Sequence, residues 1–176
     1  LKVMVRPRPG NFVYSEKELT CMDTEIDSLN QLPITGIVLG VLHDDRSINL
    51  EAVHRLSERA DPLPVTIHKA IDETRDPLQE MKKLSRIQNI QSILSSGGAQ
   101  NAETGAKMLK TMQQEFQSRF RMIAAGSITS ENLLSLHHKI GFPEYHGRKI
   151  VGDLARSSLQ KQGSGRTDQL GLKISI

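Results

Sequence analysis

The stretch VTIHKAIDETRDPLQ, residues 65–79, contains one complete strand-to-helix unit. Its first residues alternate apolar and polar side chains, which indicates a strand with one face against helices and His68 on the other face. Asp76 followed by Pro77 is an N-cap residue with proline at the first helical position, so a helix begins there, and Gln79 is placed to cap in return. The stretch therefore predicts a strand with a polar end, a loop and a helix.

The same unit recurs along the chain. Ser15 and Glu18 form the pattern of a capping box at the start of a first helix. Later helices are expected to begin near Asn49 and near Thr129. Because strands and helices alternate without a hairpin turn of the Asn-Gly kind, the pattern predicts a parallel sheet with helices outside it. The six predicted strands fall in residues 2–6, 36–40, 65–72, 92–98, 121–128 and 144–147.

Two features favour a closed barrel over an open sheet. The strands in residues 65–69 and 144–146 alternate in polarity, and no G-x-G-x-x-G follows the first strand. The predicted fold class is therefore the TIM-type (β/α)8 barrel, to which this chain supplies about six βα units of the eight that such a barrel needs. Residues 1–150 are expected to form the barrel domain, incomplete at its N-terminus. Residues 151–176, with linker-like Gly and Ser, are expected to form a divergent and partly flexible C-terminal segment.

Composition narrows the class of partner. The chain has 176 residues, 37% hydrophobic and 24% charged, with a net charge of +3 spread along it. It has no run of apolar residues long enough to span a membrane, and no basic patch interleaved with aromatic side chains. We therefore expect neither a membrane nor a nucleic acid as partner. A single cysteine, Cys21, excludes an internal disulfide and fits the reducing cytoplasm.

Candidate site residues gather where the predicted strands end, because chemistry in parallel α/β folds sits at the carboxyl ends of strands. Strand parity places four polar side chains on inward faces: Arg6, His68, Glu144 and His146. His68 is a candidate acid or base. Arg6 has two possible interpretations: a functional role at the site, or a structural ion pair with a carboxylate. Asp72 also has two possible interpretations: a role in the site, or a cap of a helix or loop.

Two strand ends are rich in glycine and serine: SSGGAQ (95–100) and AAGSITS (124–130). Backbone N–H groups in such loops, with a helix N-terminus behind them, bind phosphate or carboxylate. No G-x-x-x-x-G-K-[ST] is present, which argues against a nucleoside triphosphate. Cys21 has no C-x-x-C partner, and Met108 and Met112 fall on or near the core stripe of a helix, so spacing alone predicts no metal site.

Several of these segments together resemble the CutC family of copper-homeostasis proteins. VMVRPRPGNFVYSEKEL (3–19) is similar to the family segment R-P-R-G-G-D-F-x-Y-[ST]. IHKAID (67–72) is similar to F-H-R-A-F-D, and SILSSGG (92–98) ends like L-T-S-G-G. GIVLGVLHDDRSINLEAVHRL (36–56), IAAGSIT (123–129) and EYHG (144–147) follow the family order. The resemblance implies a cytosolic (β/α)8 barrel, often a homo-oligomer, with a polar mouth and a role in copper handling.

The matching positions imply a set of pocket residues. Catalytic roles fall to His68, Asp72 and Arg6, anion or substrate binding to Arg8, Ser96, Gly97, Gly98 and Gly126, and copper binding to His68 and His146. The chain departs from the family pattern in that Asn11 replaces Asp, Pro9 replaces Gly and Lys69 replaces Arg.

The family's first two βα units, which carry the cysteines usually considered for copper, lie upstream of Leu1. We expect either that the whole protein is longer or that this chain covers the gap by self-association. Three functions remain in view: cytosolic copper handling, a barrel enzyme acting on a small anionic substrate, and a non-catalytic fragment that acts by self-association. Whether the chain is an enzyme stays open.

Overall fold

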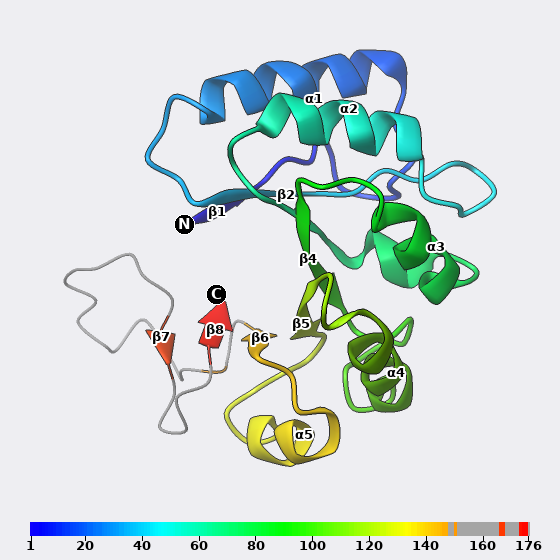
Figure 1. The fold of residues 1–176 in the computed structure, drawn as a ribbon, viewed down its shortest axis with the longest axis vertical. Coiled ribbons are helices and arrows are strands. Elements are labelled where there is room, and N and C mark those ends of the chain that lie inside the picture. The colour runs from blue at the N-terminus through cyan, green and yellow to red at the C-terminus, as the bar shows by residue number, and fades with distance from the viewer. Residues whose placement is uncertain (148–149, 151–165, 168–172, 176) are drawn as a thin grey trace. The chain divides into compact units, whose positions relative to one another are not determined.

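The computed structural model describes residues 1–147, 150, 166–167 and 173–175 of the chain (Figure 1). Six parallel strands alternate with helices, as the sequence predicts. In chain order the elements are β1 (Lys2–Met4), α1 (Glu16–Leu29), β2 (Gly36–Leu39), α2 (Leu50–Ala60), β3 (Val65–Ile67), the 3-10 helix η1 (Lys69–Glu73), α3 (Pro77–Leu84), β4 (Ile90–Ser95), α4 (Ala106–Phe116), β5 (Arg121–Ala125), α5 (Leu133–Ile140), β6 (Glu144–His146), β7 (Arg166–Thr167) and β8 (Lys173–Ser175).

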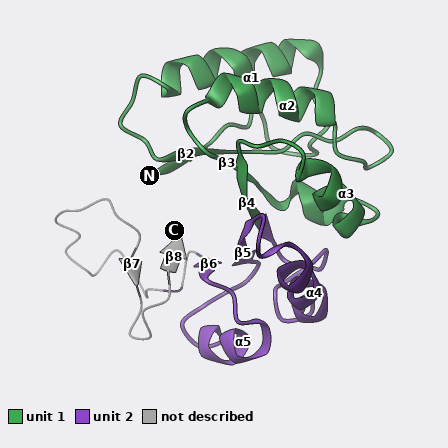
Figure 2. Ribbon diagram, viewed as in Figure 1, with its two compact units in different colours: residues 1–93 green, residues 94–176 purple. Residues whose placement is uncertain are grey.

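The chain divides into two compact units, residues 1–93 and 94–176 (Figure 2). The boundary falls inside β4, between Ile93 and Leu94. The predicted domain boundary near residue 150 stays a prediction. Most of the predicted C-terminal segment, residues 151–176, lies outside the described residues.

In the first unit, β1, β2, β3 and β4 pair in that order as parallel neighbours. Helices α1 and α2 lie side by side (Figure 1). Ser15 accepts from the backbone N–H of Glu18 while the Glu18 carboxylate accepts from the backbone N–H of Ser15, which confirms the predicted capping box. The apolar stripes that bury this unit's core include Leu19, Met22 and Ile26 of α1 and Val53, Leu56 and Ala60 of α2.

In the second unit, β5 pairs with β6 and β6 with β8, both in parallel, and β8 pairs with β7 in antiparallel fashion. Helix α5 begins at Leu133, four residues later than the predicted start near Thr129. The difference arises because the side chain of Asn132 accepts from the N–H of Thr129 and donates to the carbonyl of Ser127, which holds these residues in a turn. The buried helix residues here are Leu109, Met112, Phe116, Leu133, Leu136 and Ile140.

The strand predicted over residues 65–72 is shorter than expected. It ends at Ile67, and η1 follows because the His68 side chain caps the next turn by accepting from the N–H of Ala70. Asp76 caps α3 as predicted, accepting from the backbone N–H of Gln79. In the described residues, no helix combines the length and the apolar character that a membrane crossing requires.

Candidate functional site

A polar loop follows β1 in the first unit, and residues 6–14 are called the arginine loop below. Arg8 holds this loop together. Its guanidinium donates to the carboxylate of Glu18, the side chain of Asn11 and the carbonyl of Val13. The pKa of Glu18 is lowered, first by its hydrogen bonds with Ser15 and then by Arg8. Arg8 is therefore engaged within the loop and the start of α1, and its predicted ligand-binding role stays a prediction.

Arg6 lies on the other side of the same loop. One of its terminal nitrogens donates to the carbonyl of Gly10, and its guanidinium stacks 4.6 Å from the centre of the Phe12 ring. The Nε atom of Arg6 is buried and has no hydrogen-bond partner in the described part of the chain. The ring centres of Phe12 and His68 lie 4.6 Å apart. Phe12 thus contacts both Arg6 and His68, which the sequence places on one face.

His68 follows β3 and is 3% exposed. Its Nδ1 accepts from the N–H of Ala70 at 3.1 Å. Burial, with a further contribution from the Arg6 charge, lowers the pKa of His68 to about 4. The imidazole is therefore neutral at neutral pH, and the hydrogen bond to Nδ1 assigns its proton to Nε2. That Nε2 is buried with no partner among the described residues. Gly40 lies against the same ring, where an added Cβ would come within 2.7 Å of Cε1 and Nδ1.

Tyr14 adds a third polar group near Arg6. Its hydroxyl is buried beside the Arg6 side chain, which acts on it as a hydrogen-bond donor, although the geometry falls outside that of an ordinary hydrogen bond. Burial raises the pKa of Tyr14, and the charge of Arg6 opposes that rise. The Arg8 guanidinium lies 5.3 Å from the centre of the Tyr14 ring. Tyr14 therefore stays protonated and is a hydrogen-bond donor.

Asp72 lies in η1, where its side chain is only 6% exposed and its Oδ2 is 3.9 Å from the Nζ of Lys69. Lys69 occupies the position where the family pattern has Arg, and it supplies the charge without bidentate geometry. This ion pair is one interaction of Asp72, and a catalytic role for this residue stays a prediction.

The predicted anion-binding residues of the second unit form a tightly packed turn. The hydroxyl of Ser95 accepts from the N–H of Gly97 at 2.8 Å, and the hydroxyl of Ser96 donates to the carbonyl of Ala99 at 2.7 Å. Gly126 lies against Ser96, where an added Cβ would come within 2.9 Å of the Ser96 Cβ. The structure therefore brings Ser96 and Gly126 together. Gly97 and Gly98 have positive φ, at +74° and +68°, conformations that favour glycine.

A copper site needs donors with free lone pairs, and the described residues do not offer one as a set. No three side chains among the His, Cys, Asp and Glu of the described residues lie close enough together to hold a metal ion. Cys21 is exposed on α1. The hydrogen bond from the Ala70 N–H to Nδ1 assigns the proton of neutral His68 to Nε2, and the metal role of His68 stays a prediction. His146, the last residue of β6, is half-buried, and its metal role stays a prediction.

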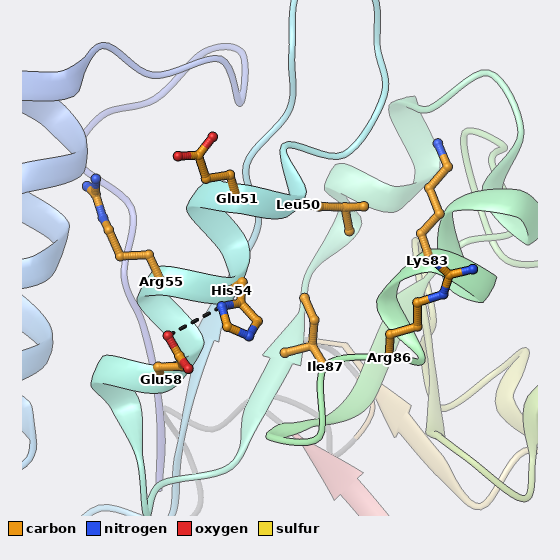
Figure 3. A pocket seen from close by; sticks show the side chains of 8 residues that line it. All are labelled: Leu50, Glu51, His54, Arg55, Glu58, Lys83, Arg86 and Ile87. Carbon is orange, nitrogen blue, oxygen red and sulfur yellow. Dashed lines mark ion pairs between the residues drawn. The ribbon is translucent and has the colours of Figure 1, made fainter.

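A groove of about 470 Å³ lies on the helical side of the first unit, between α2 and α3 (Figure 3). His54 Nδ1 and the Glu58 carboxylate form an ion pair of 3.3 Å along one wall. No predicted site residue lines this groove, whose walls are Leu50, Glu51, His54, Arg55, Glu58, Lys83, Arg86 and Ile87.

Three residues of the first site had no assigned role in the sequence. Phe12 contacts both Arg6 and His68, Tyr14 supplies a buried hydroxyl, and the N–H of Ala70 sets the tautomer of His68. The signal that points to the aromatic pair is its alternate spacing directly after the Arg-Pro-Arg-Pro segment. No sequence signal identifies the backbone contact of Ala70.

The alternating strands and helices, with polar side chains following the strands, define an α/β protein of the TIM-barrel type. A crystal structure of an enolase from environmental sequencing supports the fold alone, at 14% identity with a TM-score of 0.61 over 83% of this chain and 36% of that chain. The model of the CutC family matches residues 1–151, and the chain belongs to this family.

Relatives and a solved structure agree. A family protein CutC of Mesorhizobium japonicum is 34% identical over 168 residues, 94% of this chain and 65% of that protein. A human copper homeostasis protein cutC homolog is 32% identical over 144 residues, 82% of this chain and 52% of that protein. The crystal structure of the putative copper homeostasis protein CutC from Streptococcus agalactiae matches with a TM-score of 0.80 at 29% identity, over 85% of this chain and 72% of that chain. The chain thus spans less than two thirds of the length of these two relatives.

Proposed function

We propose that this chain takes part in copper homeostasis in the cytoplasm as a CutC protein. The observation that carries the proposal is the family match over residues 1–151, together with the name of the human relative. The single cysteine, which rules out an internal disulfide, supports a reducing compartment. Copper is the cargo in this proposal, and a homo-oligomer is the proposed assembly.

Direct copper handling is tested by titrating the chain with Cu(I) against a chromogenic chelator under reducing conditions. One Cu(I) per chain, lost in His146→Ala or Cys21→Ser, supports direct binding. A His68→Asn variant separates the two predicted histidines, because Nε2 of His68 is protonated and we expect this variant to bind Cu(I) as the parent does. Failure to compete with the chelator excludes direct Cu(I) handling by this chain. Sizing by light scattering tests the assembly, and a monomer at all concentrations contradicts it.

A second candidate function is favoured by the polar groups around the arginine loop. Arg6, Tyr14 and His68 all present donors, and the neighbouring carboxylates Glu18 and Asp72 face Arg8 and Lys69. A site in which donors outnumber acceptors suits a ligand rich in acceptors. We therefore propose, as the alternative to copper, that the mouth binds a small anionic substrate. Calorimetry with a panel of small anions tests this proposal, and the absence of binding by every anion contradicts it.

A further inference from the structure

Three hydrogen-bond donors of the first unit are buried without an acceptor among the described residues: Nε of Arg6, the hydroxyl of Tyr14 and Nε2 of His68. Buried polar groups in folded proteins are nearly always paired, because an unpaired donor loses its bond to water and gains nothing in exchange. His68 is 3% exposed, and Phe12 contacts both its ring and Arg6. The three donors belong to one local cluster. Apart from Nδ1 of His68, which the Ala70 N–H occupies, the only side-chain acceptor among these three residues is the Tyr14 hydroxyl oxygen beside Arg6. The cluster therefore has more donors than acceptors.

We infer that the cluster of Arg6, Tyr14 and His68 binds the carboxylate group of a small molecule. The inference rests on the second proposed function and names its ligand class. Carboxylate oxygens are acceptors only, and they pair with guanidinium, hydroxyl and imidazole N–H donors.

The local charge selects a monoanion. Arg8 is paired with Glu18 and Lys69 with Asp72, whereas no carboxylate of the described residues lies within ion-pair distance of Arg6. His68 and Tyr14 are neutral donors. The cluster therefore offers one uncompensated positive charge, which a carboxylate neutralises and a phosphate dianion exceeds.

The role of His68 follows from its other nitrogen. Because Nδ1 accepts from the N–H of Ala70, the ring holds its proton on Nε2 and presents a fixed donor to the ligand. A base or a metal ligand at Nε2 would need the opposite tautomer, which would set two N–H groups against each other at Nδ1. His68 is therefore a binding residue that donates one hydrogen bond.

The arginine loop covers the cluster. The carbonyl of Gly10 occupies one terminal nitrogen of Arg6, and the Phe12 ring lies against the guanidinium. Gly10 is exposed and has a φ of +101°, while Arg8 anchors the loop to Glu18. A carboxylate competes with the Gly10 carbonyl for Arg6, so we expect the 9–11 segment to move when the ligand binds and the Arg8–Glu18 anchor to stay.

The experiment is calorimetry on the full chain with acetate, pyruvate and succinate, and with inorganic phosphate, at matched ionic strength. We expect a monocarboxylate to bind and Arg6→Gln to weaken that binding about 10- to 100-fold, as expected for a charge-assisted hydrogen bond. His68→Asn retains an acceptor for the Ala70 N–H but removes the Nε2 donor together with the ring that contacts Phe12, and it should weaken binding about 5- to 10-fold. The matched controls Arg75→Gln and His54→Asn, both at exposed positions, should bind as the parent does.

The outcomes separate the inference from the proposed function. A carboxylate that binds Arg6→Gln and His68→Asn as tightly as the parent overturns the inference and leaves an anion site elsewhere in the chain. Phosphate that binds more tightly than every carboxylate also overturns it. No binding by any anion overturns both the inference and the second proposed function. Nitrogen-15 NMR of the parent gives a test independent of the variants: a neutral His68 with its proton on Nδ1 contradicts the proposed donor.

Discussion

The polar ends of the strands differ between the two units. In the first unit, the side chains of Arg6 and His68 each keep a buried N–H donor that has no hydrogen-bond partner among the described residues. In the second unit, Ser95 and Ser96 turn their hydroxyls back onto their own loop, and Gly105 packs against the backbone of Ser96. The first arrangement has unused binding capacity, whereas the second uses its polar groups to fix a backbone turn.

This contrast shows that polar residues at the ends of strands are not equivalent. Both units match family motifs and both carry residues typical of anion binding. Among the residues that the structure describes, only the strand ends of the first unit combine burial with unpaired donors, which is the physical condition for a ligand to gain hydrogen bonds on binding. We therefore expect substitutions in the second unit to act on stability, and substitutions in the first to act on binding and on pH dependence.

The largest effect is expected from Gly105→Ala in the second unit. A Cβ at Gly105 would lie 1.8 Å from the carbonyl oxygen of Ser96, and neither backbone can yield without breaking the turn. The substitution should lower the free energy of unfolding by more than about 3 kcal/mol or prevent folding, as overpacking against backbone does. Urea denaturation followed by circular dichroism measures the change.

Gly141→Ala is the matched control for this substitution. Gly141 has nothing within 4 Å of the Cβ position and only its φ of +63° opposes a side chain. Its cost should be about 1 kcal/mol, from backbone strain alone. Equal costs for the two substitutions would refute the argument that Gly105 is required by close packing.

The next effect belongs to His68 and depends on pH. Its pKa is about 4 in the folded chain against an ordinary value of 6.5, so the unfolded chain binds the proton more readily. The stability that the neutral ring supports is fully present above pH 6.5 and is lost as the pH falls through about 4. The difference between these values corresponds to about 3 kcal/mol in the free energy of unfolding.

Comparing the parent with His68→Asn isolates this contribution, because both chains share every other titrating group. The gap between their unfolding free energies should shrink as the pH falls from 6.5 to 4. His54→Asn, at an exposed position on α2, serves as the control and should follow the parent. A gap that is constant with pH would show that His68 is not buried as a neutral ring.

A pair of tyrosines gives a smaller and more direct comparison. In the second unit, Tyr145 is fully buried, its hydroxyl accepts from the N–H of Phe142, and it lies 2.9 Å from Nδ1 of His137. Tyr145→Phe leaves a buried N–H unpaired and should cost about 2 kcal/mol. Tyr14→Phe in the first unit removes a hydroxyl that makes no ordinary hydrogen bond there, so its cost should be near zero. A larger cost for Tyr14→Phe in urea denaturation would mean that this hydroxyl is paired.

Sequence reasoning predicted the parts of this molecule that depend on local pattern. The six parallel strands and the five helices between them follow from periodicity and from caps such as Ser15 and Asp76, and parity placed Arg6 and His68 on one face; the helix expected after the sixth strand lies outside the described residues. The contacts of Phe12 with both side chains and the close approach of Gly105 to Ser96 depend on tertiary packing, which a single sequence does not display. The tautomer of His68 depends on one backbone N–H of η1, and that turn was expected to be strand.

The smallest effect is expected at the N-terminus of α3, where it tests how well a local sequence pattern predicts a helix cap. Asp76 and Gln79 resemble the Ser15–Glu18 capping box, yet only one half of the exchange forms, since the Asp76 carboxylate accepts from the backbone N–H of Gln79. Asp76→Ala should therefore cost about 1 kcal/mol in unfolding free energy, the usual contribution of an N-cap. Gln79→Ala keeps that backbone N–H and should cost close to nothing. If Gln79→Ala is as destabilising as Asp76→Ala, its side chain caps the helix in solution and the full box predicted from the sequence is present.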